Sequence, residues 1–155
     1  MRTRVRLLVG LLLVGVLAGA GGWGHAAPRK GDAVADEVKR LEGTWRVVAI
    51  ETGGREQGRD EFGPNNLVVI AGTKFSIVTG RSKRTIECTF TVDPAKDPKW
   101  IDTIRTDDKA SWPGIYELKG DTLKLYFGSP GRRPTEFKTK AGDGQTIHTH
   151  ERVKE

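Results

Sequence analysis

The chain is poor in the residue types that form disulfides and metal centres. Among its 155 residues there is one Cys, Cys88, and there are three His. A single Cys excludes an intramolecular disulfide, and in the alternating stretch "TIECTFTV" its expected role is that of a small buried hydrophobe. The alternative role, a nucleophile, needs a His or another base beside the thiol.

Long uninterrupted apolar runs are also missing. The strongest one, from Leu7 to Leu17, is shorter than the roughly 20 residues that a membrane span requires. It follows the basic start "MRTRVR" and precedes the small residues of "GHAAP", which is the layout of a secretory signal peptide. We therefore predict a signal peptide at 1–26, a polar linker at 27–33 and one domain at 34–155, with cleavage after Ala26 favoured over Ala20 and Ala27. The expected location is secreted or periplasmic, with no stable membrane insertion after cleavage.

No charge of one sign dominates the expected mature chain. Without Arg2, Arg4 and Arg6, the 26 Lys and Arg residues become 23, against 20 Asp and Glu. The basic residues are also scattered among acidic ones, as in "REQGRDE", so a nucleic-acid partner is not expected.

Catalytic patterns are absent as well. Most carboxylates fall in turns, where Asp serves as a backbone cap, and no pair stands out for acid–base chemistry. The Gly-rich stretches lack the Lys and the strand-to-helix context of a nucleotide loop. The adjacent arginines of "SPGRRP" are either an anion contact or, with greater weight, part of a solvated loop. We expect neither an enzyme nor a cofactor.

What the sequence does contain is one short helical pattern followed by many short strand patterns. Val34, Val38 and Leu41 recur at helical spacing, with Asp32 as the expected N-cap and Gly43 as the stop. From Thr44 the period changes to two, and about eight strands follow, separated mostly by turns too short for a crossover helix. The predicted strands lie in "TWRVVAIE", in the two halves of "NLVVIAGTKFSIVTG", in "KRTIECTFTVD", in "KWIDTIRT", in the two halves of "GIYELKGDTLKLYFG" and in "QTIHTHERV".

Such a meander has two edges to protect and one apolar face to bury, so we predict an all-β, eight-stranded antiparallel up-and-down barrel with a short N-terminal helix. Two connections are long. The first is expected to contain a helical turn at Arg59 to Phe62, and the second a short edge strand at Thr135 to Lys138. Trp112, in "SWPG", is expected in an exposed loop, and Tyr126 is expected outside the barrel beside Lys124.

The order "LEGTWRVV", "GIYELKGDTLKLYFG", "RRPTEF" and a last strand ending in "ERVK" resembles the lipocalin-like domain family expanded in planctomycete bacteria, over roughly Val38 to Lys154. The resemblance implies an eight-stranded barrel, with no established reaction or ligand. More distantly, the chain is similar to lipocalins proper, in which a Gly-x-Trp opens the first strand and an Arg of the last strand packs over that Trp. Carried over, this likeness implies that Gly43, Trp45 and Arg152 close one end of the barrel.

The interior of the barrel is the expected ligand site. An eight-stranded barrel is either filled by its side chains or holds one small ligand. The residues expected to line a cavity are Val47, Phe75, Ile77, Phe90, Tyr116, Leu123 and Leu125.

His148 and His150 lie two apart on the last predicted strand and therefore share a face. Two imidazoles can begin a zinc or copper site, but such a site needs a third or fourth ligand, which the sequence does not nominate. If Arg152 points to the closed end, the same parity sends both histidines inside, where they would form a polar pocket. The other interpretation places them on the surface of an edge strand.

These patterns lead to two hypotheses of function. The first is a non-enzymatic binding module that carries a small hydrophobic or amphipathic ligand in the barrel, with the long loops at the open mouth. The second is a barrel with a filled core that acts through its surface, as an envelope interaction protein or an inhibitor. The volume of the interior distinguishes them.

Overall fold

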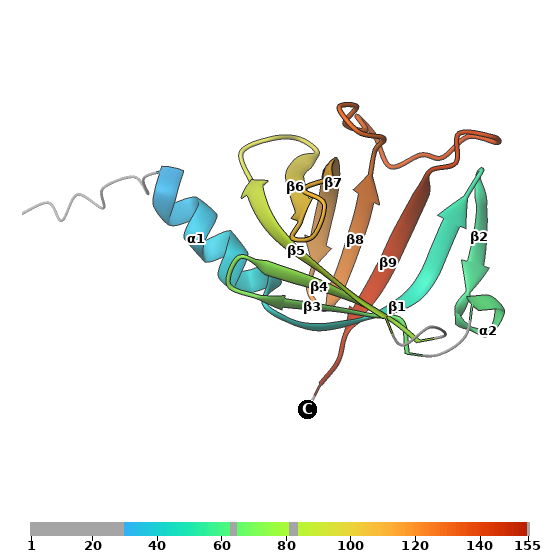
Figure 1. The fold of residues 1–155 in the computed structure, drawn as a ribbon, viewed down its shortest axis with the longest axis horizontal. Helices are drawn as coiled ribbons and strands as arrows, with labels where there is room; N and C mark the ends of the chain where they lie inside the picture. Colours follow the sequence, from blue (N-terminus) through green and yellow to red (C-terminus); the bar gives the residue numbers. More distant parts are fainter. Residues whose placement is uncertain (1–29, 63–64, 81–83, 155) are drawn as a thin grey trace, which may run out of the picture.

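The computed structural model describes residues 30–62, 65–80 and 84–154 of the chain. Within these ranges the polypeptide forms one antiparallel sheet in the order β2-β1-β3-β4-β5-β6-β7-β8-β9, and a further pairing of β1 with β9 closes it. Eight of the strands make up a closed barrel, and β2 is an added hairpin strand on β1 (Figure 1). The predicted all-β barrel with a short N-terminal helix is confirmed. The elements are α1 (Lys30–Leu41), β1 (Gly43–Thr52), β2 (Arg55–Gly58), α2 (Arg59–Phe62), β3 (Leu67–Ala71), β4 (Lys74–Thr79), β5 (Arg84–Asp93), β6 (Lys99–Arg105), β7 (Ser111–Lys119), β8 (Thr122–Phe127) and β9 (Thr146–Arg152).

The closing strand β1 changes partner along its length. Its first half pairs with β3, and its second half, from Ala49, pairs with β2. Its register with β9 shifts between Val47 and Ala49, so one residue more lies on β1 than on β9. This bulge changes which side chains face inward, from Trp45 and Val47 before it to Ile50 after it.

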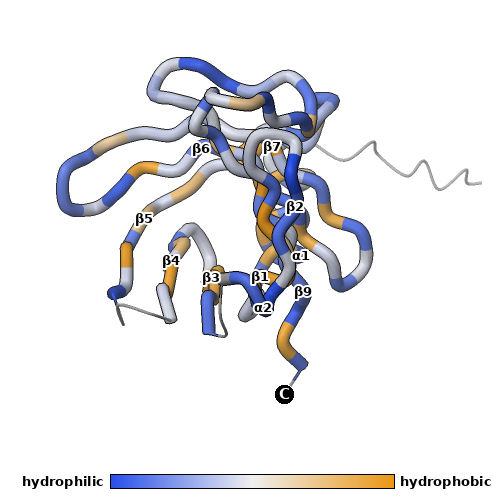
Figure 2. Tube along the Cα trace, turned by 90° about the vertical axis from the view of Figure 1, so that its right-hand side faces the viewer, coloured by the Kyte–Doolittle hydropathy of each residue, from blue (hydrophilic) through white to orange (hydrophobic). Residues whose placement is uncertain are grey.

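The two ends of the barrel are built differently. At one end lie α1, the β7–β8 turn and the last residues of β9, and Figure 1 shows α1 beside this end of the sheet, away from β2 and α2. The other end, the mouth, is formed by the β6–β7 turn, the end of β8 and the start of β9. In Figure 2 the hydrophobic stretches lie on the strands, whereas the connections between them are mostly hydrophilic.

Most strands lie where the period of two predicted them, and the predicted turns at 71–73 and 119–121 are present, with Gly72 and Gly120 at positive φ. The helix was predicted less well. It begins at Lys30, so the predicted linker overlaps its first turn, and Asp32 lies inside the helix instead of capping it. An acidic residue in the first turn still complements the helix dipole, which is why Asp32 fits there.

The long connections differ in their agreement with the prediction. The helical turn at Arg59–Phe62 is present, but β2 was missed, because its four residues "REQG" carry no apolar alternation. The predicted edge strand at Thr135 to Lys138 is wrong, because this segment pairs with none of the described strands. It lies instead on the outer face of the barrel, where Phe137 packs against Ile115, Tyr126 and Ile147.

Tyr126 shows the effect of this cover. Its side chain points outside the barrel, as predicted, but it is buried and not exposed beside Lys124. The hydroxyl group lies 2.6 Å from Gln145 Oε1 and 3.1 Å from the carbonyl oxygen of Lys138. Burial raises the pKa of this phenol, so it remains a neutral donor that fixes the segment 128–145 to the barrel.

Candidate functional site

The closed end is organised around Trp45, whose side chain is fully buried. The indole Nε1 donates to the carbonyl oxygen of Leu41 over 2.8 Å, and the guanidinium carbon of Arg152 lies 4.1 Å from the ring centroid. Arg152 also donates to the backbone carbonyls of Arg40, in the last turn of α1, and of Glu42, directly after the helix. One cation therefore covers the indole and caps the helix C-terminus at the same time.

This arrangement explains the glycine two residues before the tryptophan. Gly43 has a φ of 128°, and a Cβ built on it would lie 2.7 Å from Arg152 Nη1. Any other residue would be strained and would push the guanidinium away. Gly43, Trp45 and Arg152 thus lie together, as the resemblance implied, and seal the barrel.

A second set of contacts fixes α1 to the barrel. Glu37 is only 4% exposed, and its carboxylate accepts hydrogen bonds from Lys99 Nζ (2.6 Å), Arg40 Nη1 (2.8 Å) and the Tyr116 hydroxyl (3.1 Å). Burial pushes the pKa of Glu37 upward, but the bonds from Lys99 and Tyr116 outweigh it and bring the pKa below its usual value. These contacts hold the helix against the barrel.

Between the closed end and the mouth the barrel encloses a cavity of about 550 Å³. Its wall is mainly aliphatic and aromatic, with contributions from every barrel strand. A volume of this size lies in the range of small-molecule sites, which are usually lined by apolar side chains with a few placed polar groups. The residues that line it include Val47, Phe75, Ile77, Ile86, Thr103, Arg105, Trp112, Leu125, Thr146, His148 and His150.

The predicted cavity residues divide into two groups. Val47, Phe75, Ile77 and Leu125 line the cavity. The prediction was wrong for Phe90, Tyr116 and Leu123, which are buried in the filled half of the barrel near the helix. Alternation in the sequence predicts which face of a strand a side chain lies on, but not its position along the barrel axis. These three residues lie too close to the closed end to line the cavity.

Strand β9 contributes three polar residues to the wall. Thr146, His148 and His150 all line the cavity, so the inward interpretation of the histidines is the one the structure supports. From the mouth inward they follow one another along the strand, and we call them the histidine wall. His148 Nε2 lies 3.0 Å from Thr146 Oγ1, and His150 Nδ1 lies 3.1 Å from the carbonyl oxygen of Leu123.

Both imidazoles are held in the neutral form. Burial lowers the pKa of His148, and burial together with the neighbouring His148 lowers the pKa of His150 to about 4. Only a protonated nitrogen can bond to a carbonyl oxygen, so Nδ1 of His150 carries the proton and Nε2 carries a lone pair. That Nε2 atom is buried and has no hydrogen-bond partner among the residues that the structure describes.

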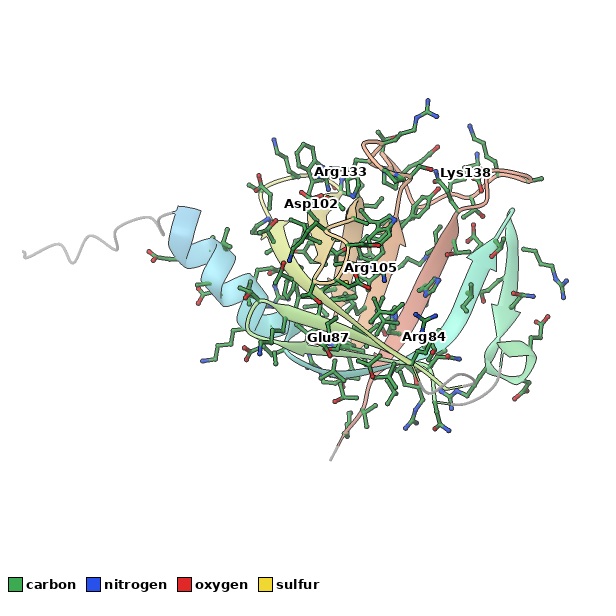
Figure 3. All side chains as sticks on the ribbon, viewed as in Figure 1. Arg84, Glu87, Asp102, Arg105, Arg133 and Lys138 are labelled. Carbon is green, nitrogen blue, oxygen red and sulfur yellow. The ribbon has the colours of Figure 1, made fainter. Side chains whose placement is uncertain are left out.

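Arg105 and Trp112 form the opposite wall near the mouth. The guanidinium of Arg105 binds the carboxylates of Asp107 and Asp108, which lie in the β6–β7 turn, and it holds the pKa of Asp107 below its usual value. In Figure 3, Arg105 lies over the middle of the barrel, whereas Arg133 and Lys138 lie with the outer segment. Trp112 was expected in an exposed loop, but it belongs to β7, is half-buried and lines the cavity.

The histidines do not come with a ligand set for a metal. Their ring centroids are 6.1 Å apart, and among the described residues no group of three or more His, Cys, Asp and Glu side chains gathers at one point. A zinc site uses three or four protein ligands. The thiol of Cys88 is the other type of side chain that binds zinc. Cys88 is 3% exposed and burial raises the pKa of its thiol, so a packing role fits it better than metal ligation.

The second arginine of "SPGRRP", Arg133, has a structural role. Arg133 Nη2 donates to both oxygens of Asp102, at 2.6 and 2.9 Å, and the guanidinium lies 4.3 Å from the centroid of Trp100. This residue clamps the outer segment to β6 instead of meeting an anion at the mouth. Sequence reasoning missed this pair, because Asp102 and Arg133 lie 31 residues apart with no pattern linking them.

Comparison of the chain with family models, with curated proteins and with solved structures finds no match. Within the described residues, no helix has both the length and the apolar character needed to cross a bilayer.

Proposed function

We propose that this protein is a non-enzymatic binding module that carries a small hydrophobic or amphipathic molecule in its barrel. The observation that carries the proposal is the cavity of about 550 Å³ beside a fully packed closed end. Transfer of apolar surface from water into such a wall is favourable by about 25 cal/mol per Å². The lipocalin-like family and export from the cytoplasm belong to the same proposal, and the predicted signal segment 1–26 lies outside the described residues.

A filled core acting through the outer surface is the competing hypothesis. It requires the side chains to occupy the interior, and they do so only in the half of the barrel nearest α1. The open half therefore supports ligand carriage over a purely surface role.

Filling the cavity tests the proposal. Ile86 is partly buried, lines the cavity and points inward from β5, whereas Thr89 on the same strand is exposed. We expect the neutral probe N-phenyl-1-naphthylamine to bind the wild type with a rise in fluorescence. Ile86→Trp should weaken this binding by about tenfold or more, because the larger side chain takes the space of the probe.

The matched control is Thr89→Trp, which adds an indole outside the barrel and should leave binding unchanged. Melting curves show that both variants are folded. Equal probe binding by the two variants would contradict the proposal, and so would a wild type that binds no apolar probe. Native mass spectrometry of protein purified from its own host then gives the mass of whatever is carried.

A further inference from the structure

The polar groups of the cavity wall specify the ligand further. The apolar area of the wall alone would favour a hydrocarbon ligand. The histidine wall, however, places imidazole rings inside this mainly apolar cavity. A buried polar group without a partner costs about 1 to 3 kcal/mol. A wall of this kind therefore discriminates between ligands by the hydrogen-bonding group that they bring.

His150 determines which group fits. Its side chain is fully buried, its Nδ1–H donates to the carbonyl oxygen of Leu123, and within residues 30–62, 65–80 and 84–154 its Nε2 has no hydrogen-bond partner. Because the ring is neutral, Nε2 accepts a hydrogen bond and cannot donate one. The missing partner is thus a donor.

His148 lies one step nearer the mouth and does not supply that donor. Its ring centroid is 6.1 Å from that of His150, and its Nε2 is bonded to Thr146. The surrounding positions on the paired strands are apolar: Val47 faces His150 on β1, and Leu125 faces His148 on β8. A donor must therefore arrive with the ligand or with water.

We propose that the cavity selects apolar molecules that carry a hydroxyl group, and that this hydroxyl donates a hydrogen bond at the histidine wall, to Nε2 of His150. The inference rests on the proposed carrier function and adds the chemical class of the ligand, which is that of long-chain or polycyclic alcohols. The apolar body of the ligand lies against Phe75, Ile77 and Leu125.

Two isomers isolate the hydrogen bond from the hydrophobic effect. Decan-1-ol and methyl nonyl ether have the same atoms, and both have an oxygen that accepts, but only the alcohol donates. Hydrophobic binding alone predicts equal affinity or a preference for the ether, because the alcohol loses more hydrogen bonds to water. We expect titration calorimetry to show that the wild type binds the alcohol about tenfold more tightly than the ether.

Variants locate the donor's partner. His150→Leu should bring the ratio of the two affinities close to one, because it replaces the imidazole by an apolar side chain of similar size. Thr103→Val is the matched control: it removes a polar group from the opposite side of the same cavity and should keep the tenfold ratio. Both affinities are measured on the same variant, so partial unfolding cancels in the ratio.

The outcomes separate the two inferences. Equal affinities for the isomers in the wild type overturn hydroxyl selection and leave the carrier function standing. A preference for the alcohol that survives in His150→Leu, or that disappears in Thr103→Val, also overturns the assignment to the histidine wall. If neither isomer binds or raises the melting temperature, both the carrier function and the selection fail.

Discussion

The two halves of this barrel satisfy their polar groups in different ways. In the closed half, Trp45 has a carbonyl for its N–H, Arg152 has carbonyls and an indole, and Glu37 has three donors. In the open half, Nε2 of His150 and the buried Nε of Arg105 have no hydrogen-bond partner in the described part of the chain. Buried polar groups in native proteins are normally hydrogen-bonded. Unpaired ones therefore point to a functional role and not to a contribution to stability.

Packing differs in the same sense. Near α1, Phe90, Tyr116 and Leu123 belong to one buried core cluster, whereas toward the mouth the barrel walls surround a cavity. The hydrophobic burial in the closed half thus offsets the burial that is missing around the cavity in the open half. Mutations that act on one half only can test this difference in packing.

The largest effect is expected at the closed end. Trp45→Ala removes a fully buried indole, its hydrogen bond to Leu41 and the surface on which Arg152 lies. It should lower the free energy of unfolding by about 3 to 5 kcal/mol. Trp112→Ala, at the cavity wall, should cost distinctly less, because that indole borders open space. Urea unfolding curves of both variants measure the difference, and equal losses would mean that the two halves are packed alike.

A double-mutant cycle measures the interaction between Trp45 and Arg152 at the closed end. Trp45→Ala and Arg152→Ala should be coupled by on the order of 1 kcal/mol, since each removes the partner of the other. Purely additive losses would show that the guanidinium over the indole contributes no energy of its own.

The halves also differ in how far the sequence alone predicts them. At the closed end, a glycine, a tryptophan and an arginine fall in a recognised order, and the strict period of two in β5 locates the core. At the open end, the same periodicity puts His148 and His150 on the inward face, yet it does not say that a cavity remains there. Cavity volume is the difference between barrel size and summed side-chain volume, and no local pattern records it.

Long-range pairs set the other limit. The Tyr126 hydroxyl is covered by Gln145, and Arg133 reaches Asp102, because an irregular segment folds back over the outer face. Alternation predicts only that Tyr126 points away from the interior. Whether an outward side chain meets water or another segment depends on a loop with no periodic signal.

The next effect belongs to the open half and depends on pH. In the folded protein burial lowers the pKa of His150 to about 4 from 6.5, so the unfolded chain binds more protons between these values. The contribution of His150 to the free energy of unfolding should be fully present above pH 6.5. It should fall by about 3 kcal/mol as the pH drops from 6.5 through 4. His150→Leu should remove most of this slope, as measured by urea unfolding from pH 7 to pH 4. A slope unchanged in the variant would place the titration elsewhere, with His148 as the nearest group to test.

A loss of stability smaller than those expected for Trp45→Ala and for the titration of His150 concerns the contact between the helix and the barrel. Glu37→Gln keeps the shape of the side chain but removes the charge that Lys99 and Arg40 pair with, and it should cost about 2 kcal/mol at neutral pH. The pKa of Glu37 is lowered in the folded state, so its contribution is present above the ordinary value of 4.5 and is lost as the pH falls through the folded value. The difference between variant and wild type should therefore shrink in acid. Glu61→Gln is the control: it removes the charge that pairs with the exposed Arg55 and keeps a side-chain oxygen that can accept from the N–H of Gly58, so it should cost well under 1 kcal/mol. If the two variants are equally stable, the helix is held by the apolar contacts of Val34, Val38 and Leu41 alone, and the polar contacts of the closed half contribute no more than those of the surface.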